Sequence, residues 1–106
     1  MTDTKTLNRV ARRLHRDDIE IGNARDMARD MPWFELDNED QDYYRKVAVA
    51  FINALEFVEH DLNDAAMVLT YLYLTENPNR AWDTAAIFCA TYDSIAMVND
   101  VLKGGK

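Results

Sequence analysis

The sequence predicts an all-α protein, a single-domain bundle of four to five helices. Three observations support this. Hydrophobic residues make up 48% of the 106 residues, which is too much burial capacity for a disordered chain. Only 3 glycines and 2 prolines are present, too few for the many turns of a sandwich or barrel. Apolar residues also recur with helical spacing along most of the chain. We therefore expect residues 1–106 to form one helical domain.

Residues 1–16 are predicted to form a basic amphipathic helix. Its apolar residues fall at i, i+3, i+4 and i+7, from Leu7 to Leu14, and share one helical face. The basic-helix surface on the other faces consists of Arg9, Arg12, Arg13 and Arg16. His15 is expected to be a solvated neighbour of these arginines. Asp17-Asp18 offers a helix stop or a new N-cap. Gly22-Asn23 offers a second break before a short helix that Pro32 would end.

The segment after Pro32 joins an aromatic anchor to an acidic helix start. Trp33, Phe34 and Leu36 are expected to cap the core, with an exposed interface anchor at Trp33-Phe34 as the alternative. Asp37 or Asn38 can cap the next helix, whose first turn carries carboxylates that favour the positive end of the helix dipole. The candidate partner-binding residues are Trp33, Phe34, Glu35, Asp37, Glu39, Asp40 and Asp42.

Residues 33–106 are expected to form the main helical body. Its central helix, about 38–59, has an apolar arc so wide that it must contact partners on two sides. A C-terminal helical hairpin is expected at about 62–103, and Asp61 or Asn63 can cap its first helix. Val68 to Leu74 could alternatively form a strand. The inward positions predicted for the last helix are Trp82, Ala85, Ala86, Cys89, Tyr92, Ile95, Val98 and Leu102.

The sequence predicts no enzyme, no cofactor and no metal site. The single cysteine excludes an intramolecular disulfide and a thiolate cluster, and no phosphate loop or Ser-His-Asp set is present. The alternative is a metal-dependent all-α hydrolase that uses Glu56, Glu59 and Asp61. Glu56-x-x-Glu59 resembles the first motif of the MazG-type nucleotide pyrophosphatases, whose second motif, Glu-x-x-Asp, is absent downstream.

Charge and hydropathy limit the partners of the protein. No run approaches the 18 apolar residues of a membrane span and no signal peptide is evident, so we expect a cytoplasmic protein without membrane contact. The net charge of −7 disfavours nucleic acid, with weak binding through the basic first helix as the alternative. The sequence does not decide between a monomer and a homodimer.

The stretch from Trp33 to Leu55 resembles a segment of small phage-encoded proteins of unassigned role. The residues that carry the resemblance are Trp33, Leu36, Gln41, Tyr44, Arg45, Ala48, Ala54 and Leu55. The resemblance implies a phage or prophage accessory protein. With the acidic charge and the missing catalytic set, it leads to the hypothesis of a non-enzymatic binding protein that docks on an unidentified host protein and modulates it.

Overall fold

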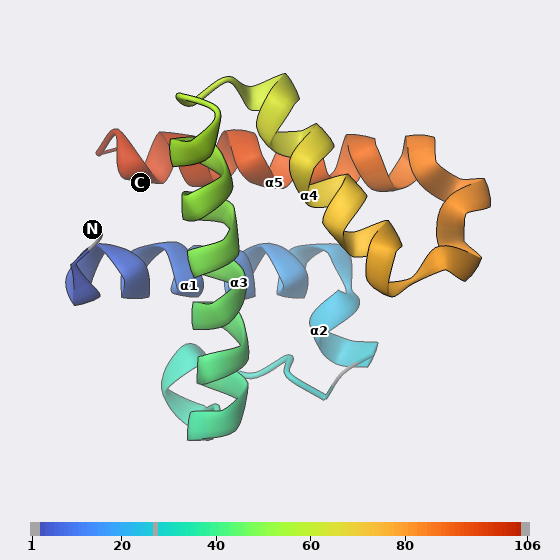
Figure 1. The fold of residues 1–106 in the computed structure, drawn as a ribbon. Coiled ribbons are helices and arrows are strands. Elements are labelled where there is room, and N and C mark those ends of the chain that lie inside the picture. The colour runs from blue at the N-terminus through green and yellow to red at the C-terminus, as the bar shows by residue number, and fades with distance from the viewer. Residues whose placement is uncertain (1–2, 27, 105–106) are drawn as a thin grey trace. The chain divides into compact units, whose positions relative to one another are not determined.

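The computed structural model describes residues 3–26 and 28–104, and within these residues the chain is helical without any strand (Figure 1). The elements are α1 (Thr4–Ile21), α2 (Asn23–Asp26), the 3-10 helix η1 (Trp33–Glu35), α3 (Asn38–Phe57), α4 (Leu62–Glu76), the 3-10 helix η2 (Pro78–Asp83) and α5 (Thr84–Leu102). The predicted all-α class is confirmed. The long helix expected at 38–59 is also confirmed and is α3. The hairpin expected at 62–103 is confirmed as well and consists of α4 and α5.

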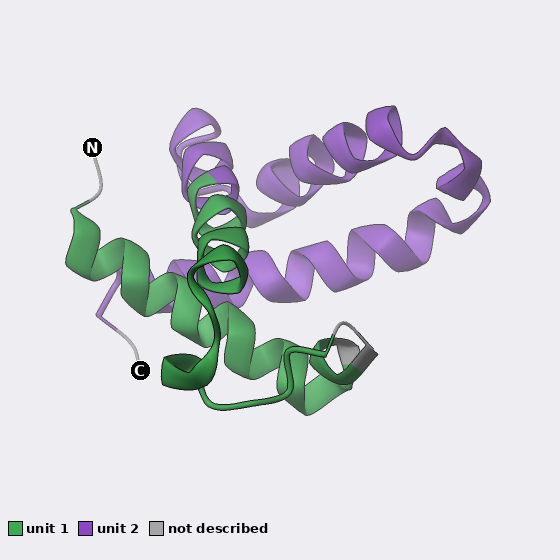
Figure 2. Ribbon diagram, turned by 90° about the horizontal axis from the view of Figure 1, so that it is seen from below, with its two compact units in different colours: residues 1–49 green, residues 50–106 purple. Residues whose placement is uncertain are grey.

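The chain divides into two compact units, residues 1–49 and residues 50–106 (Figure 2). The division falls between Val49 and Ala50, in the middle of α3, so this helix supplies residues to both units. The expectation that residues 1–106 form one domain stays a prediction.

The first helix is longer than the sequence suggested. The Asp3 side chain caps its start by accepting a hydrogen bond from the Thr6 N–H at 2.7 Å. The helix then runs through Asp17-Asp18 and ends at Gly22, whose φ of 87° is left-handed. The predicted stop at Asp17-Asp18 is therefore wrong. An aspartate inside a helix lowers the stability of the helix by less than about 1 kcal/mol. Burial of Leu14 in the preceding turn stabilises the helix by more than this.

The short second helix ends before the proline that was expected to end it. α2 stops at Asp26, and Met27 lies outside the described residues. Ala28 has a left-handed φ of 55°, and its N–H donates to the Arg25 carbonyl. A left-handed residue stops an α-helix because it turns the next N–H away from the helical ladder.

The boundaries of α3 come from a cap and a backbone reversal. Asp37 is the N-cap, since its Oδ1 accepts the Asp40 N–H at 2.8 Å. At the other end Glu59 and His60 both have left-handed φ, 54° and 66°. The His60 N–H donates to the Leu55 carbonyl at 2.7 Å, which closes the end of the helix. The helix therefore ends at Phe57, two residues earlier than predicted.

In the second unit α4 and α5 form an antiparallel hairpin joined by η2. Asp61 caps α4 through a hydrogen bond from the Asp64 N–H to its Oδ1 at 2.9 Å. The strand alternative for Val68 to Leu74 is wrong, because these residues lie within α4. The buried side chains of the hairpin lie on one face of each helix, and the apolar ones are Ala65, Ala66, Leu69, Ile95, Val98 and Val101.

The first half of the last helix is not buried as predicted. Trp82 is 81% exposed, Cys89 is exposed and Tyr92 is partly exposed, and Ala85 and Ala86 are exposed too. The predicted inward face was correct only from Ile95 onward. Helical periodicity identifies an apolar face, but a hairpin provides each helix with only one neighbouring helix to cover it.

One helical stretch among the described residues, Pro78–Leu102, is long and apolar enough by length and composition alone to cross a membrane. Core helices of soluble proteins pass the same test, so the finding does not decide the environment. The expectation of a protein without membrane contact stays a prediction.

The cap of α4 gives the first test. Asp61→Ala should lower the free energy of unfolding by about 1 kcal/mol, because the Asp64 N–H loses its acceptor. Asp61→Ser keeps a capping oxygen and should cost less than half as much. Urea unfolding followed by circular dichroism measures both, and equal losses in the two variants would contradict the assigned cap.

Candidate functional site

The adjacent aromatic residues Trp33 and Phe34 lie in different environments. The Trp33 ring is half-buried, with its centroid 5.8 Å from that of His15 and 6.4 Å from that of Tyr44. The Phe34 ring is 80% exposed. The sequence offered core cap and interface anchor as alternatives for the pair. The structure half-buries Trp33, as expected of a core cap, and leaves Phe34 exposed, because the 3-10 turn of η1 directs consecutive side chains apart.

Arg45 holds η1 and α1 against the start of α3. Its Nε donates to Asn8 Oδ1 at 2.8 Å and its Nη1 to Asp42 Oδ1 at 2.7 Å. Its guanidinium carbon also lies 5.7 Å from the centre of the Trp33 ring, within the range of a cation–π interaction. Gln41 adds a bond from its Nε2 to the Trp33 carbonyl at 2.9 Å. These contacts fix the turn that carries Phe34.

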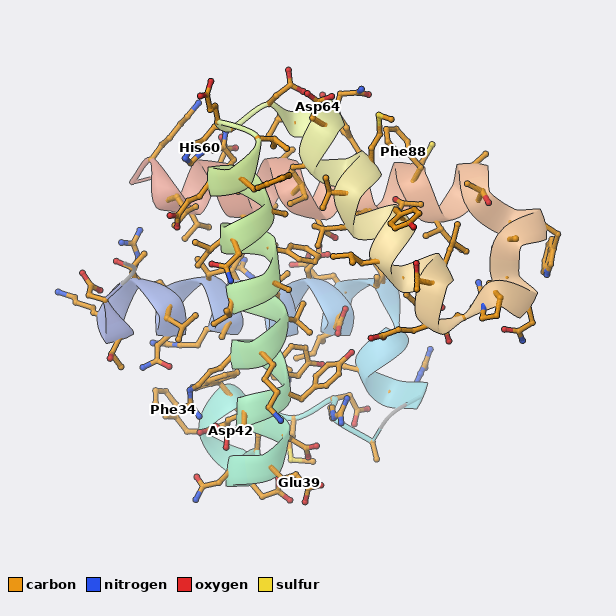
Figure 3. The ribbon with its side chains drawn as sticks, in the orientation of Figure 1. Phe34, Glu39, Asp42, His60, Asp64 and Phe88 are labelled. Carbon is orange, nitrogen blue, oxygen red and sulfur yellow. The ribbon has the colours of Figure 1, made fainter. Side chains whose placement is uncertain are left out.

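The exposed ring of Phe34 lies within an acidic surface. The guanidinium carbon of Arg12 lies 5.1 Å from the ring centre, and exposed carboxylates follow along η1 and the first turns of α3 (Figure 3). We define the Phe34 patch as Phe34, Arg12, Glu35, Asp37, Glu39 and Asp42. This patch joins two sites that the sequence treated separately, since Arg12 was assigned to the basic-helix surface.

Asp40 is a candidate carboxylate that pairs with Arg29, in the segment between α2 and η1. Its Oδ1 accepts a hydrogen bond from Arg29 Nε at 2.8 Å, and both side chains are largely covered. Arg29 also lies over the Tyr43 ring, 4.3 Å from its centre. Asp40 therefore has a structural task, whereas Glu35 and Glu39 are exposed on the patch.

The basic-helix surface is also divided by the structure. Arg9, Arg12 and Arg16 are exposed and Arg13 is half-buried. Arg16 lies 3.5 Å from Glu20 Oε1, one turn further along α1. The four arginines follow one face of α1 at positions i, i+3, i+4 and i+7, with Arg12 over the Phe34 ring and Arg16 beside a carboxylate. The alternative of a weak nucleic-acid binder through this helix stays a prediction.

His15 is buried, and the prediction of a solvated histidine is wrong. Its side chain is 2% exposed, and its Nε2 donates to the Arg29 carbonyl at 2.8 Å, which ties α1 to the segment before η1. The ring centroid also lies 5.1 Å from that of Tyr44. The signal was present in the sequence, because His15 lies four residues after Ala11 on the apolar side of α1.

Asp18 and Tyr44 form the polar edge of the same cluster. Burial raises the pKa of the Asp18 carboxyl, and its interaction with the Tyr44 hydroxyl opposes that rise. Burial, reinforced by the Asp18 charge, raises the pKa of the Tyr44 phenol. Tyr44 is 1% exposed, so its hydroxyl lies inside the first unit.

The residues of the alternative hydrolase do not form a site. Glu56, Glu59 and Asp61 are all exposed, and Asp61 Oδ1 is occupied by the cap of α4. Throughout the part of the chain that the structure describes, no three His, Cys, Asp or Glu side chains are grouped to hold a metal ion. The nearby His60 instead pairs its Nδ1 with Asn99 Oδ1 at 3.0 Å.

Comparison of the chain with protein-family models, with curated proteins and with solved structures gives no match.

The Arg45 network gives a second test. Arg45→Lys should lower the free energy of unfolding by about 1 kcal/mol or more, because an ammonium cannot reproduce the bonds of the planar guanidinium to Asn8 and Asp42. The neighbouring exposed Lys46→Ala should change it by less than about 0.5 kcal/mol. Thermal unfolding of both variants checks this, and equal stability would contradict the role of Arg45.

Asp18 gives a pH test whose sign follows from its raised pKa. The folded state binds the Asp18 proton more tightly than the unfolded state, so ionisation of this group destabilises the fold as the pH rises above the ordinary value of 3.8. Asp18→Asn removes this ionisation. Its stability relative to the natural protein should therefore increase between pH 3 and pH 7 in urea titrations. A difference that does not vary with pH would contradict the assignment.

Proposed function

We propose that this chain is a non-enzymatic, cytoplasmic binding protein of phage or prophage origin that docks on a host protein through the Phe34 patch and modulates it. The observation that carries the proposal is the 80% exposure of Phe34 within an acidic surface. An exposed phenylalanine leaves about 1.5–3 kcal/mol of burial free energy unused in the free protein. That free energy becomes available when a partner covers the ring.

The support of Phe34 favours it over the other exposed phenylalanine. Phe57 is equally exposed, at 80%, but it is the last residue of α3 and no ring or cation contact to its side chain is seen among the described residues. Phe34 lies in a turn held by the Gln41 bond to the Trp33 carbonyl and has the Arg12 guanidinium over its ring. A side chain ordered before binding loses less conformational entropy on binding, which makes a better anchor.

The charge around Phe34 indicates the chemistry of the partner. Carboxylates outnumber the Arg12 cation in the patch. The shallow depression beside Asp42 also contains two cations, Arg45 and Lys46, so the acidic rim ends there. An apolar anchor with an acidic rim fits a basic surface that has an apolar socket. The basic groove of a nucleic-acid enzyme has this chemistry, and the acidic rim would then occupy the place of phosphates.

The resemblance to small phage-encoded proteins supports the proposed origin. The residues that carry it include Trp33, Tyr44 and Arg45, which hold η1 against α3, whereas Gln41 stands where the pattern has an arginine. Phe34 is not among them. We infer that the shared pattern describes the supporting frame, and that the contact residues on it determine the partner.

Phe34→Ala should abolish capture of the host partner without affecting the fold. The ring is already exposed, so the free energy of unfolding should change by less than about 0.5 kcal/mol. Loss of a central anchor should weaken binding by about 30-fold or more. The experiment is affinity capture from host lysate at low salt with the natural chain and the variant immobilised at equal density, followed by mass spectrometry.

Phe57→Ala is the matched control, because it removes an equally exposed phenylalanine from the second unit. It should retain the captured protein. Capture should also decrease as salt is raised, because the acidic rim is exposed and screened. A partner retained equally by both variants would contradict the Phe34 patch, and no capture by the natural chain would contradict the binding function.

A further inference from the structure

Every exposed side chain of α1 from Lys5 to Arg16 carries a positive charge. The exposed residues of this stretch are Lys5, Arg9, Arg12 and Arg16, which we call the basic stripe. Their spacing of four, three and four residues places them along one line of the helix, roughly 16 Å long at about 1.5 Å of rise per residue. The helix therefore presents a straight row of cations.

The sequence of α1 lacks the carboxylates that would normally balance such a row. No aspartate or glutamate lies between Asp3 and Asp17. Each cation of the basic stripe instead has another cation of the stripe three or four residues away, and like charges at these spacings destabilise a helix. Arg16 lies beside Glu20, but both side chains are well exposed, and such a pair is weak. A polyanion laid along the stripe would relieve the repulsion.

We propose that the basic stripe binds the phosphate backbone of duplex DNA without reading its sequence. Three of the four cations are arginines, whose planar guanidinium groups donate paired hydrogen bonds to phosphate. A duplex is a stiff polyanion with one negative charge per about 1.7 Å of its axis, so it offers several phosphates to a straight helix of this length. This function goes beyond docking through the Phe34 patch, with which the stripe shares only Arg12.

The structure argues against other anionic partners. A lipid surface binds a basic helix that also inserts apolar side chains, but Val10 and Ala11 of α1 are fully buried. A protein interface depends on a few buried aromatic or apolar anchors, and the described stretch from Lys5 to Arg16 exposes no such side chain. Single strands are bound by aromatic rings that stack on their bases. The exposed ring beside the stripe, Phe34, is flanked by carboxylates instead.

The test is the salt dependence of binding of the full chain to a fluorescein-labelled duplex of about 20 base pairs, measured by fluorescence anisotropy. The net charge of −7 opposes binding at long range, so the titrations start at low salt. Four phosphate contacts predict a slope of about −3.6 for the logarithm of the association constant against the logarithm of salt concentration. The affinity should then fall about 150-fold between about 50 and 200 mM salt. A duplex of unrelated sequence should give the same affinity.

The variant Arg9→Gln/Arg16→Gln removes two charges of the basic stripe and should reduce the slope to about −1.8. The matched control is Lys46→Gln/Lys103→Gln, which removes two exposed cations that lie outside α1 and changes the net charge equally. The control should keep the slope of the natural chain. Circular dichroism checks that both variants keep their fold.

Four results would overturn the inference. The first is no change in anisotropy with the natural chain at low salt. The second is an equal slope in the two double variants. The third is tighter binding to a single strand of the same length than to the duplex. The fourth is flotation with phosphatidylserine vesicles that the arginine variant abolishes, which would assign the stripe to a lipid surface. Both double variants keep Phe34 and Arg12, so docking on a host protein is tested separately.

Discussion

Burial of the Tyr44 ring is the constraint on which the first unit depends. The ring contacts His15 from α1, Trp33 from η1 and the neighbouring Tyr43 from α3, so a single side chain brings three elements together. Arg29 and Arg45 then close two sides of the cluster, each by pairing with a carboxylate and lying over an aromatic ring. Because Trp33 is held in this way, the turn of η1 must direct Phe34 outward.

The sequence was informative where a local rule determines the structure. Asp37 and Asp61 were among the candidate caps and are the caps observed, because a carboxylate before a helix has an N–H to bind at a fixed distance along the chain. The expected helices of the second half were found for a similar reason, since proline, glycine and helical periodicity act over a few residues.

The sequence failed where burial depends on which neighbour covers a face. His15 was assigned to solvent because arginines surround it in the sequence, although its position on α1 turns it inward. Trp82 and Cys89 were assigned to the core because their face is apolar, although both side chains are exposed. In the candidate site, the acidic residues were found from composition. The sequence did not reveal the role of Arg45 or the contact of Arg12 with Phe34, because each of them joins segments that are distant in the sequence.

The different surroundings of the two tryptophans make them separate optical reporters. Trp33 is half-buried beside aromatic and cationic groups in the first unit, and Trp82 is 81% exposed on η2 of the second. An indole in water emits at longer wavelength than an enclosed one, so the intrinsic fluorescence of the chain is a sum of two distinguishable signals. With Trp82 replaced by phenylalanine, the emission would follow the first unit alone. With Trp33 replaced instead, it would follow the hairpin, and the two halves of the chain could be observed independently as they melt.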